Sequence, residues 1–208
     1  IECKYYVPHE FKRNFCNNID TFSVLHLNAR SLNRNLDSVK DLLLSLDNPF
    51  TVIGITESWL TTHSPPLFDL NGYQTIRVDR ERGRGGGVVL YVRTGLTFTI
   101  MEEVMPISED VECLFVEICD KTDKKIDIGL IYRSPHTSVP LFIDNLDKCL
   151  HTLSRRGKHT YVMGDFNINV MQSEHELNDN CLLTMFNSYA LYPLINKPTR
   201  ISPTSATL

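Results

Sequence analysis

Four apolar runs in the sequence each stop on polar side chains that could take part in catalysis. In chain order these side chains are Asn28, Glu57, Tyr132 and the pair Asp165 and Asn167. Alternate residues of an extended chain project to the same side, so Asp165 and Asn167 can reach one reacting centre while Phe166 anchors the turn from the opposite face. Because polar residues at strand ends converge on one edge of layered α/β folds, the set predicts a single site.

These residue types suit metal-assisted cleavage of a phosphodiester. Glu57 is a hard oxygen ligand of the kind that binds a hydrated Mg²⁺ in contact with a substrate phosphate. Asp165 could orient or deprotonate the attacking water if it stays ionised beside the cation. Asn28 and Asn167 can donate to phosphate oxygens on which charge builds in the transition state, and Tyr132 can add a phenolic donor. None of these roles needs a cofactor beyond the ion, and no small organic cofactor is expected.

Each of these residues also has a structural interpretation. Asp165 and Asn167 are ordinary turn formers at the end of a strand. Glu57 could stabilise the start of a helix or turn, and Tyr132 could be a core tyrosine with its hydroxyl at the rim. The set as a whole, and not any single member, favours catalysis.

Other chemistries fit the sequence less well. The glycine tract at 83–87 precedes a strand and lacks a following Gly-Lys-Ser/Thr, so it is neither a phosphate-binding loop nor a dinucleotide fingerprint. We expect a tight turn there with close backbone approach. The seven histidines show no zinc spacing, and His26 is expected to be a packed core residue. No GxSxG motif occurs.

Arginines flank the predicted site. Four of them fall in one short segment, and the candidates for contacts to a nucleic-acid backbone are Arg30, Arg84 and Arg133. Such clustering could follow the phosphates of DNA, and a solvated charge run with Asp79 and Glu81 is an equally common outcome. The net charge of −4 excludes wholesale coating of the protein by nucleic acid but not a few local contacts.

The elements that must position these residues alternate between strands and helices. Apolar residues at helical spacing predict a helix after Ser31 that ends at Asp47, and further helices at 140–153 and 177–189. Strands are predicted at 21–27, 51–56, 73–78, 88–92, 96–100, 111–119, 126–132 and 160–164. This order predicts an α/β (α+β) fold in which two sheets pack together with helices outside.

Length and composition indicate one intracellular domain. The chain has 208 residues, 42% of them hydrophobic and 22% charged, which is typical of one globular domain. Residues 1–20 lack steady periodicity and are expected to be a loosely packed leader before a domain at 21–208. Six dispersed cysteines without a CxxC pair, no Asn-x-Ser/Thr acceptor, no signal peptide and no membrane-length apolar run favour a nuclear or cytoplasmic protein without membrane association.

Five segments in their order resemble the endonuclease/exonuclease/phosphatase superfamily, and more narrowly the apurinic-type endonuclease domain of non-LTR (LINE-type) retrotransposon polyproteins. They are LHLNARSL (25–32), ITESWL (55–60), GGGVVLYV (85–92), IYRSP (131–135) and GDFN (164–167). The resemblance covers about residues 21–208. It implies a four-layered αββα sandwich of two mostly antiparallel sheets, hydrolysis that depends on Mg²⁺ or Mn²⁺, and nicking of target DNA to prime reverse transcription.

The resemblance also implies roles for individual residues. Glu57 would ligate the metal and Asn28 would bind near the metal and the nucleophile. Tyr132 would touch phosphate, Asp165 would handle the water, and Asn167 would stabilise the charge of the transition state. The implied partners are DNA and, in a full-length polyprotein, a reverse transcriptase domain.

One departure concerns the C-terminus. The family continues past Leu208 with an Ile-Asp strand and a Ser-Asp-His motif, which this sequence lacks. We therefore expect a fragment of a longer product, with a sandwich incomplete at its C-terminus and weak activity. The alternatives are a phosphodiesterase or phosphatase of the same superfamily that acts on small phosphoesters, and an inactive module that binds nucleic acid or protein.

Overall fold

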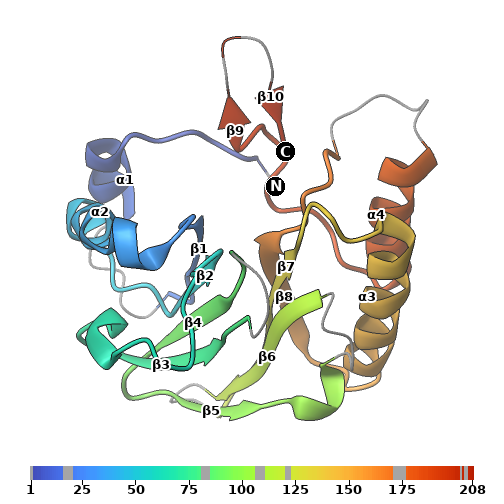
Figure 1. Cartoon of the computed structure of the whole chain (residues 1–208), viewed down its shortest axis with the longest axis horizontal. Helices are drawn as coiled ribbons and strands as arrows, with labels where there is room; N and C mark the ends of the chain where they lie inside the picture. The colour runs from blue at the N-terminus through green and yellow to red at the C-terminus, as the bar shows by residue number, and fades with distance from the viewer. Residues whose placement is uncertain are drawn as a thin grey trace.

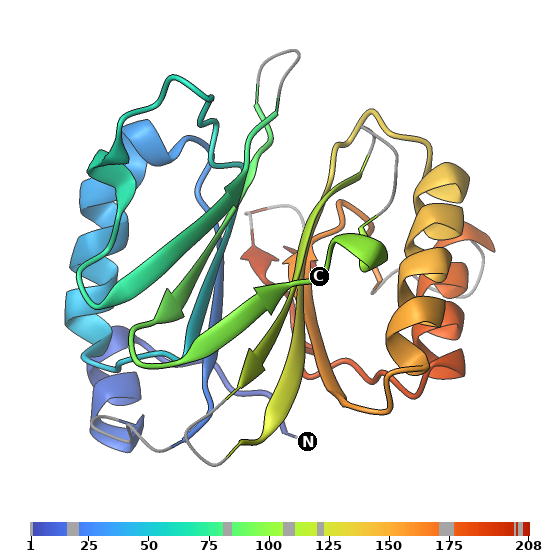
Figure 2. The same ribbon diagram turned by 90° about the horizontal axis from the view of Figure 1, so that it is seen from below.

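Two four-stranded sheets pack face to face between outer layers of helices in this computed structural model (Figure 1, Figure 2). The structure describes residues 2–15, 21–80, 85–105, 111–119, 123–170, 177–201, 203 and 206–208. The helices are α1 (Pro8–Phe15), α2 (Leu32–Leu46), α3 (Val139–Ser154) and α4 (Leu177–Ser188), with the short 3₁₀ helices η1 (Pro66–Phe68) and η2 (Glu102–Val104).

The strands fall into three groups. The first sheet has, in spatial order, β1 (Val24–Asn28), β2 (Val52–Thr56), β4 (Val88–Arg93) and β3 (Tyr73–Val78). The second sheet has β5 (Thr97–Ile100), β6 (Val111–Cys119), β7 (Lys125–Arg133) and β8 (His159–Asp165). A separate pair is formed by β9 (Arg200–Ile201) and β10 (Ala206–Thr207), which the sequence patterns did not predict.

Each large sheet contains one pair of parallel strands joined by a helix. β1 runs parallel to β2 with α2 between them in the chain, and β7 runs parallel to β8 with α3 between them. The other described pairings are antiparallel. Parallel strands end at the same edge of a sheet, so Asn28 lies beside Thr56 and Tyr132 lies beside Asp165. The predicted sandwich of two mostly antiparallel sheets with helices outside is confirmed.

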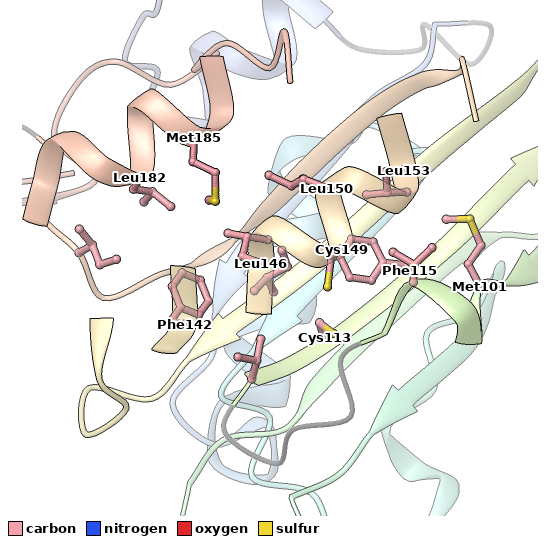
Figure 3. Packing of buried hydrophobic residues seen from close by; sticks show 14 residues of the cluster. Met101, Cys113, Phe115, Phe142, Leu146, Cys149, Leu150, Leu153, Leu182 and Met185 are labelled. Carbon is pink, nitrogen blue, oxygen red and sulfur yellow. The ribbon is translucent and has the colours of Figure 1, made fainter. Parts of the chain in front are cut away.

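Three apolar clusters hold the four layers together. Period-two alternation explains how one strand serves two of them: Val52 of β2 faces the second sheet, whereas Ile53 and Ile55 face α2. Figure 3 shows the cluster between the second sheet and its helices, in which side chains of β6, α3 and α4 take part. The residues of that cluster include Cys113, Phe115, Phe142, Leu146, Cys149, Leu150, Leu153, Leu182 and Met185. The two sheets are therefore fixed on both faces and form a rigid platform.

Helix α2 begins directly after Ser31 and ends at Asp47, as the sequence predicts. Asp47 adopts a left-handed conformation (φ 46°), and its N–H donates to the carbonyl of Leu43 at 3.1 Å. Ser31 makes no capping hydrogen bond through its side chain. Its N–H instead donates to the carbonyl of Glu57 at 2.9 Å, which ties the start of α2 to the end of β2.

Helix α1 was not predicted from the sequence. Residues 8–15 lie within the segment that was expected to be a loosely packed leader, and they form two turns of helix with no buried residue. Phe11 packs against Phe50, with ring centroids 6.0 Å apart, and Lys12 pairs with Asp47 at 2.9 Å. A helix this short carries too few apolar residues to reveal a period. Of the described helices, none has the length and apolar character needed to span a membrane.

Candidate active site

One side chain of the first sheet connects carboxylates from both sheets. The Nδ2 atom of Asn28, at the end of β1, donates to Oε1 of Glu57 at 2.7 Å and to Oδ2 of Asp165 at 2.5 Å. Because both oxygens accept from the same nitrogen atom, the carboxylates of Glu57 and Asp165 are direct neighbours. The structure thus brings together three of the predicted site residues, and it places Glu57 and Asp165 on the same side of the molecule.

The main chain around Glu57 is held in a left-handed conformation. Glu57 follows β2 with φ 52°, a conformation that costs a non-glycine residue free energy. Hydrogen bonds from the loop after β1 offset this cost, because Ala29 N–H donates to Thr56 at 2.9 Å and Ser31 N–H to Glu57. The ladder between β1 and β2 thus continues past the strands and fixes where the Glu57 side chain begins.

Backbone strain among the described residues concentrates at this edge. Eight non-glycine residues have positive φ, and five of them lie in loops of the candidate site. These five are Arg30, Ser31, Glu57, Trp59 and Asn167. Strained conformations persist where the surroundings over-determine them, and they gather at functional sites. The clustering supports a functional edge independently of the residue types.

Asp165 is held by the turn that follows β8. Its Oδ1 atom accepts from the N–H of Asn167 at 3.0 Å, while Oδ2 faces Asn28. Phe166 packs between Phe142 and Phe186, with ring centroids 6.1 and 5.8 Å away. The expected anchoring role of Phe166 is therefore confirmed, and both carboxylate oxygens of Asp165 have fixed directions.

Asn167 reaches the site through a turn and not through an extended chain. The strand ends at Asp165, and Asn167 has φ 49°. Its Nδ2 atom donates to the carbonyl of Arg133 at 2.8 Å, yet the residue is exposed. Asn167 therefore stays beside Asp165, although the alternation used to place it does not apply beyond the strand.

Arg133 points into the protein. The residue is 4% exposed, and its guanidinium donates to main-chain carbonyls at 2.5 to 3.3 Å. The carbonyls belong to Ser134, Thr137, Phe166 and Asn167. Burial lowers the pKa of the guanidinium, and the nearby Asp165 opposes this effect. This placement differs from the predicted DNA contact, because Arg133 here organises the loop that carries Asn167.

Tyr132 lies between the sheets with its ring almost fully covered. It pairs with Asp165 on one side and with Glu112 on the other. Burial and, to a smaller extent, the Glu57 carboxylate raise the pKa of Tyr132 to about 12, while Arg80 acts in the opposite direction. The hydroxyl therefore stays protonated near neutral pH and can donate a hydrogen bond.

His26 lies inside β1 and is partly buried, whereas the sequence predicted a packed core residue. Its Nε2 atom lies 3.1 Å from Oγ1 of Thr56, which is fully buried. Burial lowers the pKa of His26 to about 4, although the Asp165 carboxylate acts in the opposite direction. The imidazole is therefore neutral near neutral pH and supports the strand that ends on Asn28.

The remaining predicted residues have different outcomes. Arg30 is exposed at the rim, and its N–H donates to Oδ1 of Asn28 at 3.2 Å. Arg84 lies outside the described residues, as do Gly83 and Glu81. Within the described part of the glycine tract, residues 85–87 have φ of 72° to 89° and form the close backbone approach that was expected.

The sequence patterns missed Glu112. This residue of β6 is 8% exposed, and its carboxylate accepts from the Nε of Arg80 and from the N–H of Gly87. The guanidinium carbon of Arg80 lies 5.9 Å from the ring centroid of Tyr132. The available signal was a carboxylate near the start of an otherwise apolar strand, which does not identify its distant partners.

The donor atoms at the site suit a hydrated magnesium ion. Among the described residues there is no group of three or more His, Cys, Asp or Glu side chains that could hold a metal. The converging oxygens belong to the carboxylates of Glu57 and Asp165, to which Asn28 turns its amide nitrogen, while Oδ1 of Asn28 accepts from the N–H of Arg30 at 3.2 Å. Mg²⁺ prefers oxygen ligands and keeps several waters, so one or two carboxylates suffice.

Comparisons with known proteins bear on the fold of this chain. The model of the Endonuclease/Exonuclease/phosphatase family matches residues 18–200. A comparison of the sequence with curated proteins gave no match. Solved structures that match include AP endonuclease LMAP from Leishmania major, with a TM-score of 0.57 and 15% identity over 81% of this chain and 65% of that chain.

Two further solved structures share the fold. The 3'-5' exonuclease NExo from Neisseria meningitidis has a TM-score of 0.53 and 17% identity, over 79% of this chain and 70% of that chain. The human Nocturnin catalytic domain has a TM-score of 0.53 and 13% identity, over 73% of this chain and 65% of that chain. The chain therefore spans less than two thirds of the LMAP and Nocturnin structures, and the likeness establishes the fold.

Proposed function

The chain belongs to the endonuclease/exonuclease/phosphatase family, and we propose that its site hydrolyses phosphodiester bonds of DNA with the help of Mg²⁺, or of Mn²⁺ in its place. The observation that carries the proposal is the pair of hydrogen bonds from Asn28 to Glu57 and Asp165. A family-typical fold alone would not predict the convergence of these groups from two different sheets.

The residues of the site divide the work. Glu57 would hold the cation together with Asn28, and the bound cation would neutralise charge on the phosphate. Asp165 would orient the attacking water and accept its proton, because one carboxylate oxygen is fixed by Asn167 and the other faces the centre. Tyr132 would donate to a phosphate oxygen, since its raised pKa keeps it protonated.

DNA is the proposed substrate because two of the matching folds are named as an AP endonuclease and a 3'-5' exonuclease. Arg30 supports the proposal, since it is exposed directly beside Asn28 and could contact a phosphate. Arg84 keeps the same proposed role on the sequence pattern alone. We do not propose a DNA contact for Arg133, because its guanidinium donates to carbonyls inside the protein.

We also propose a biological role for the hydrolysis and a low turnover rate. The order of the five sequence segments supports a nuclease that nicks target DNA for retrotransposition, next to a reverse transcriptase in the same polyprotein. As the sequence comparison led us to expect, we propose that turnover by these 208 residues is slow.

A nicking assay on supercoiled plasmid tests the proposal. We expect slow conversion to open circles with Mg²⁺ or Mn²⁺, loss of nicking with EDTA, and loss in Glu57→Gln and Asp165→Asn. Asp144→Asn is the matched control, because Asp144 is an exposed partner of Lys148 on α3. Hydrolysis of small phosphoesters without nicking would point to the phosphatase alternative. Salt-dependent DNA binding without any hydrolysis would point to a binding module.

A further inference from the structure

A buried carboxylate lies beside the candidate site without facing its centre. The side chain of Glu112 is 9% exposed, and both of its oxygens have partners. Oε1 accepts from the Nε of Arg80, and Oε2 accepts from the main-chain N–H of Gly87. Burying a charge is costly, and replacing such an ion pair by apolar residues is often neutral or stabilising. The position of Glu112 therefore calls for a reason other than stability.

Gly87 connects Glu112 to the predicted metal ligand. The carbonyl of Gly87 accepts from Ser58 N–H at 3.1 Å, and the carbonyl of Gly86 accepts from Trp59 N–H at 2.8 Å. Ser58 and Trp59 directly follow Glu57 in the chain. Glu57 is thus held from one side by the loop after β1 and from the other by the glycine tract.

The glycine tract leaves little freedom for this connection. Gly86 and Gly87 have φ of 72° and 79°, which side chains rarely adopt. A Cβ atom on Gly86 would overlap Arg80 and Glu112, and one on Gly87 would overlap Oγ of Ser58. The backbone of Gly86 and Gly87 therefore passes between Glu112 and the loop after Glu57 with no room for a side chain.

We propose that Glu112 is a positioning residue that sets the geometry of Glu57 toward a divalent cation through the main chain of Gly87. The proposal rests on the function proposed above, since it concerns the same metal. Glu112 orients the Gly87 peptide, the Gly87 carbonyl fixes Ser58, and Ser58 fixes the left-handed conformation of Glu57. Residues that orient a ligand in this way contribute to metal affinity without touching the ion.

Calorimetric titration of the 208-residue chain with Mg²⁺ and with Mn²⁺ tests this role. In Glu112→Gln an amide nitrogen replaces one acceptor, so the Gly87 and Arg80 donors cannot both be satisfied. We expect the dissociation constant to rise about tenfold. An unchanged constant, within twofold of the wild-type value in a folded variant, would overturn the proposal.

Glu117→Gln is the matched control. Glu117 lies on the same strand with a side chain 12% exposed, but it pairs with Lys125, Lys158 and Arg156. We expect this variant to lower the melting temperature and to leave the dissociation constant unchanged. An equal loss of metal affinity in both variants would show a general effect of instability and would also overturn the proposal.

One further measurement covers a variant that does not fold. If Glu112→Gln does not fold, the amide resonance of Gly87 in the wild-type chain decides. We expect it to shift on saturation with Mg²⁺ while that of Gly129 on β7 stays in place, and a stationary Gly87 resonance contradicts the coupling.

If the wild-type chain binds neither cation, the proposed function fails and this inference fails with it. If the wild type binds and Glu112→Gln binds equally, only the inference fails.

Discussion

Glu57 follows a strand of the first sheet and Asp165 ends a strand of the second, yet both accept a hydrogen bond from the same atom, Nδ2 of Asn28. A different set of main-chain contacts positions each carboxylate. Glu57 is set by a left-handed backbone between two loops, and Asp165 by the N–H of Asn167. The site is therefore preorganised by main-chain hydrogen bonds, which a rigid sandwich can hold without help from the substrate.

Replacing Asn28 should abolish most of the activity without unfolding the protein. In Asn28→Ala the two carboxylates lose their shared donor and the proposed cation loses a neighbour, so we expect the single-turnover nicking rate to fall about 100-fold. The exposed position of Asn28 predicts a nearly unchanged melting temperature. Asn33→Ala, on the exposed side of α2, is the control. A rate within threefold of wild type would contradict the role assigned to Asn28.

Much of the fold and the outline of the site could be predicted from the sequence because the signals are local. The apolar run before Glu57 and the strand-forming runs of β3 and β6 each lie within a few residues, and β3 and β6 have the predicted bounds. A polar residue at the end of such a run marks a strand end. The packing rules for layered folds then bring strand ends together.

What could not be predicted depends on contacts between residues distant in the chain. Glu112 binds Arg80 and Gly87, which precede it by 32 and 25 residues, and no pattern in the sequence indicates these pairings. Arg133 could equally have faced DNA or its own carbonyls, because a guanidinium suits both. The direction of such a side chain is decided by the tertiary structure alone.

Arg133 should contribute to stability and not to the electrostatics of DNA binding. Arg133→Lys loses the planar set of donors to four carbonyls, so we expect the free energy of unfolding in urea to fall by about 2 kcal/mol or more. The slope of log affinity for duplex DNA against log salt should stay the same, whereas loss of a phosphate contact would reduce it by about 1. A reduced slope with unchanged stability would restore the predicted DNA contact.

Gly164 should be intolerant of any side chain. Its φ is 152°, and a Cβ atom there would overlap the carbonyl oxygen of Ile131 on β7. We expect Gly164→Ala to lower the free energy of unfolding by about 3 kcal/mol or more, because the backbone of β7 or β8 must move. Gly157→Ala is the matched control, since Gly157 has φ 63° and open space around it. Its expected cost is about 1 kcal/mol, and equal costs in urea denaturation would contradict the overlap.

His26 should make the protein less stable in mild acid. The pKa of His26 is lowered to about 4 in the folded protein, whereas an unfolded histidine has a pKa of about 6.5. Between these values the unfolded chain binds more protons, so stability is full above about pH 6.5 and falls as the pH drops toward 4. From pH 7.5 to 5, wild type should lose roughly 1–2 kcal/mol more than His26→Gln. The exposed His63 supplies the control His63→Gln, which should follow wild type; parallel curves for wild type and His26→Gln would refute the prediction.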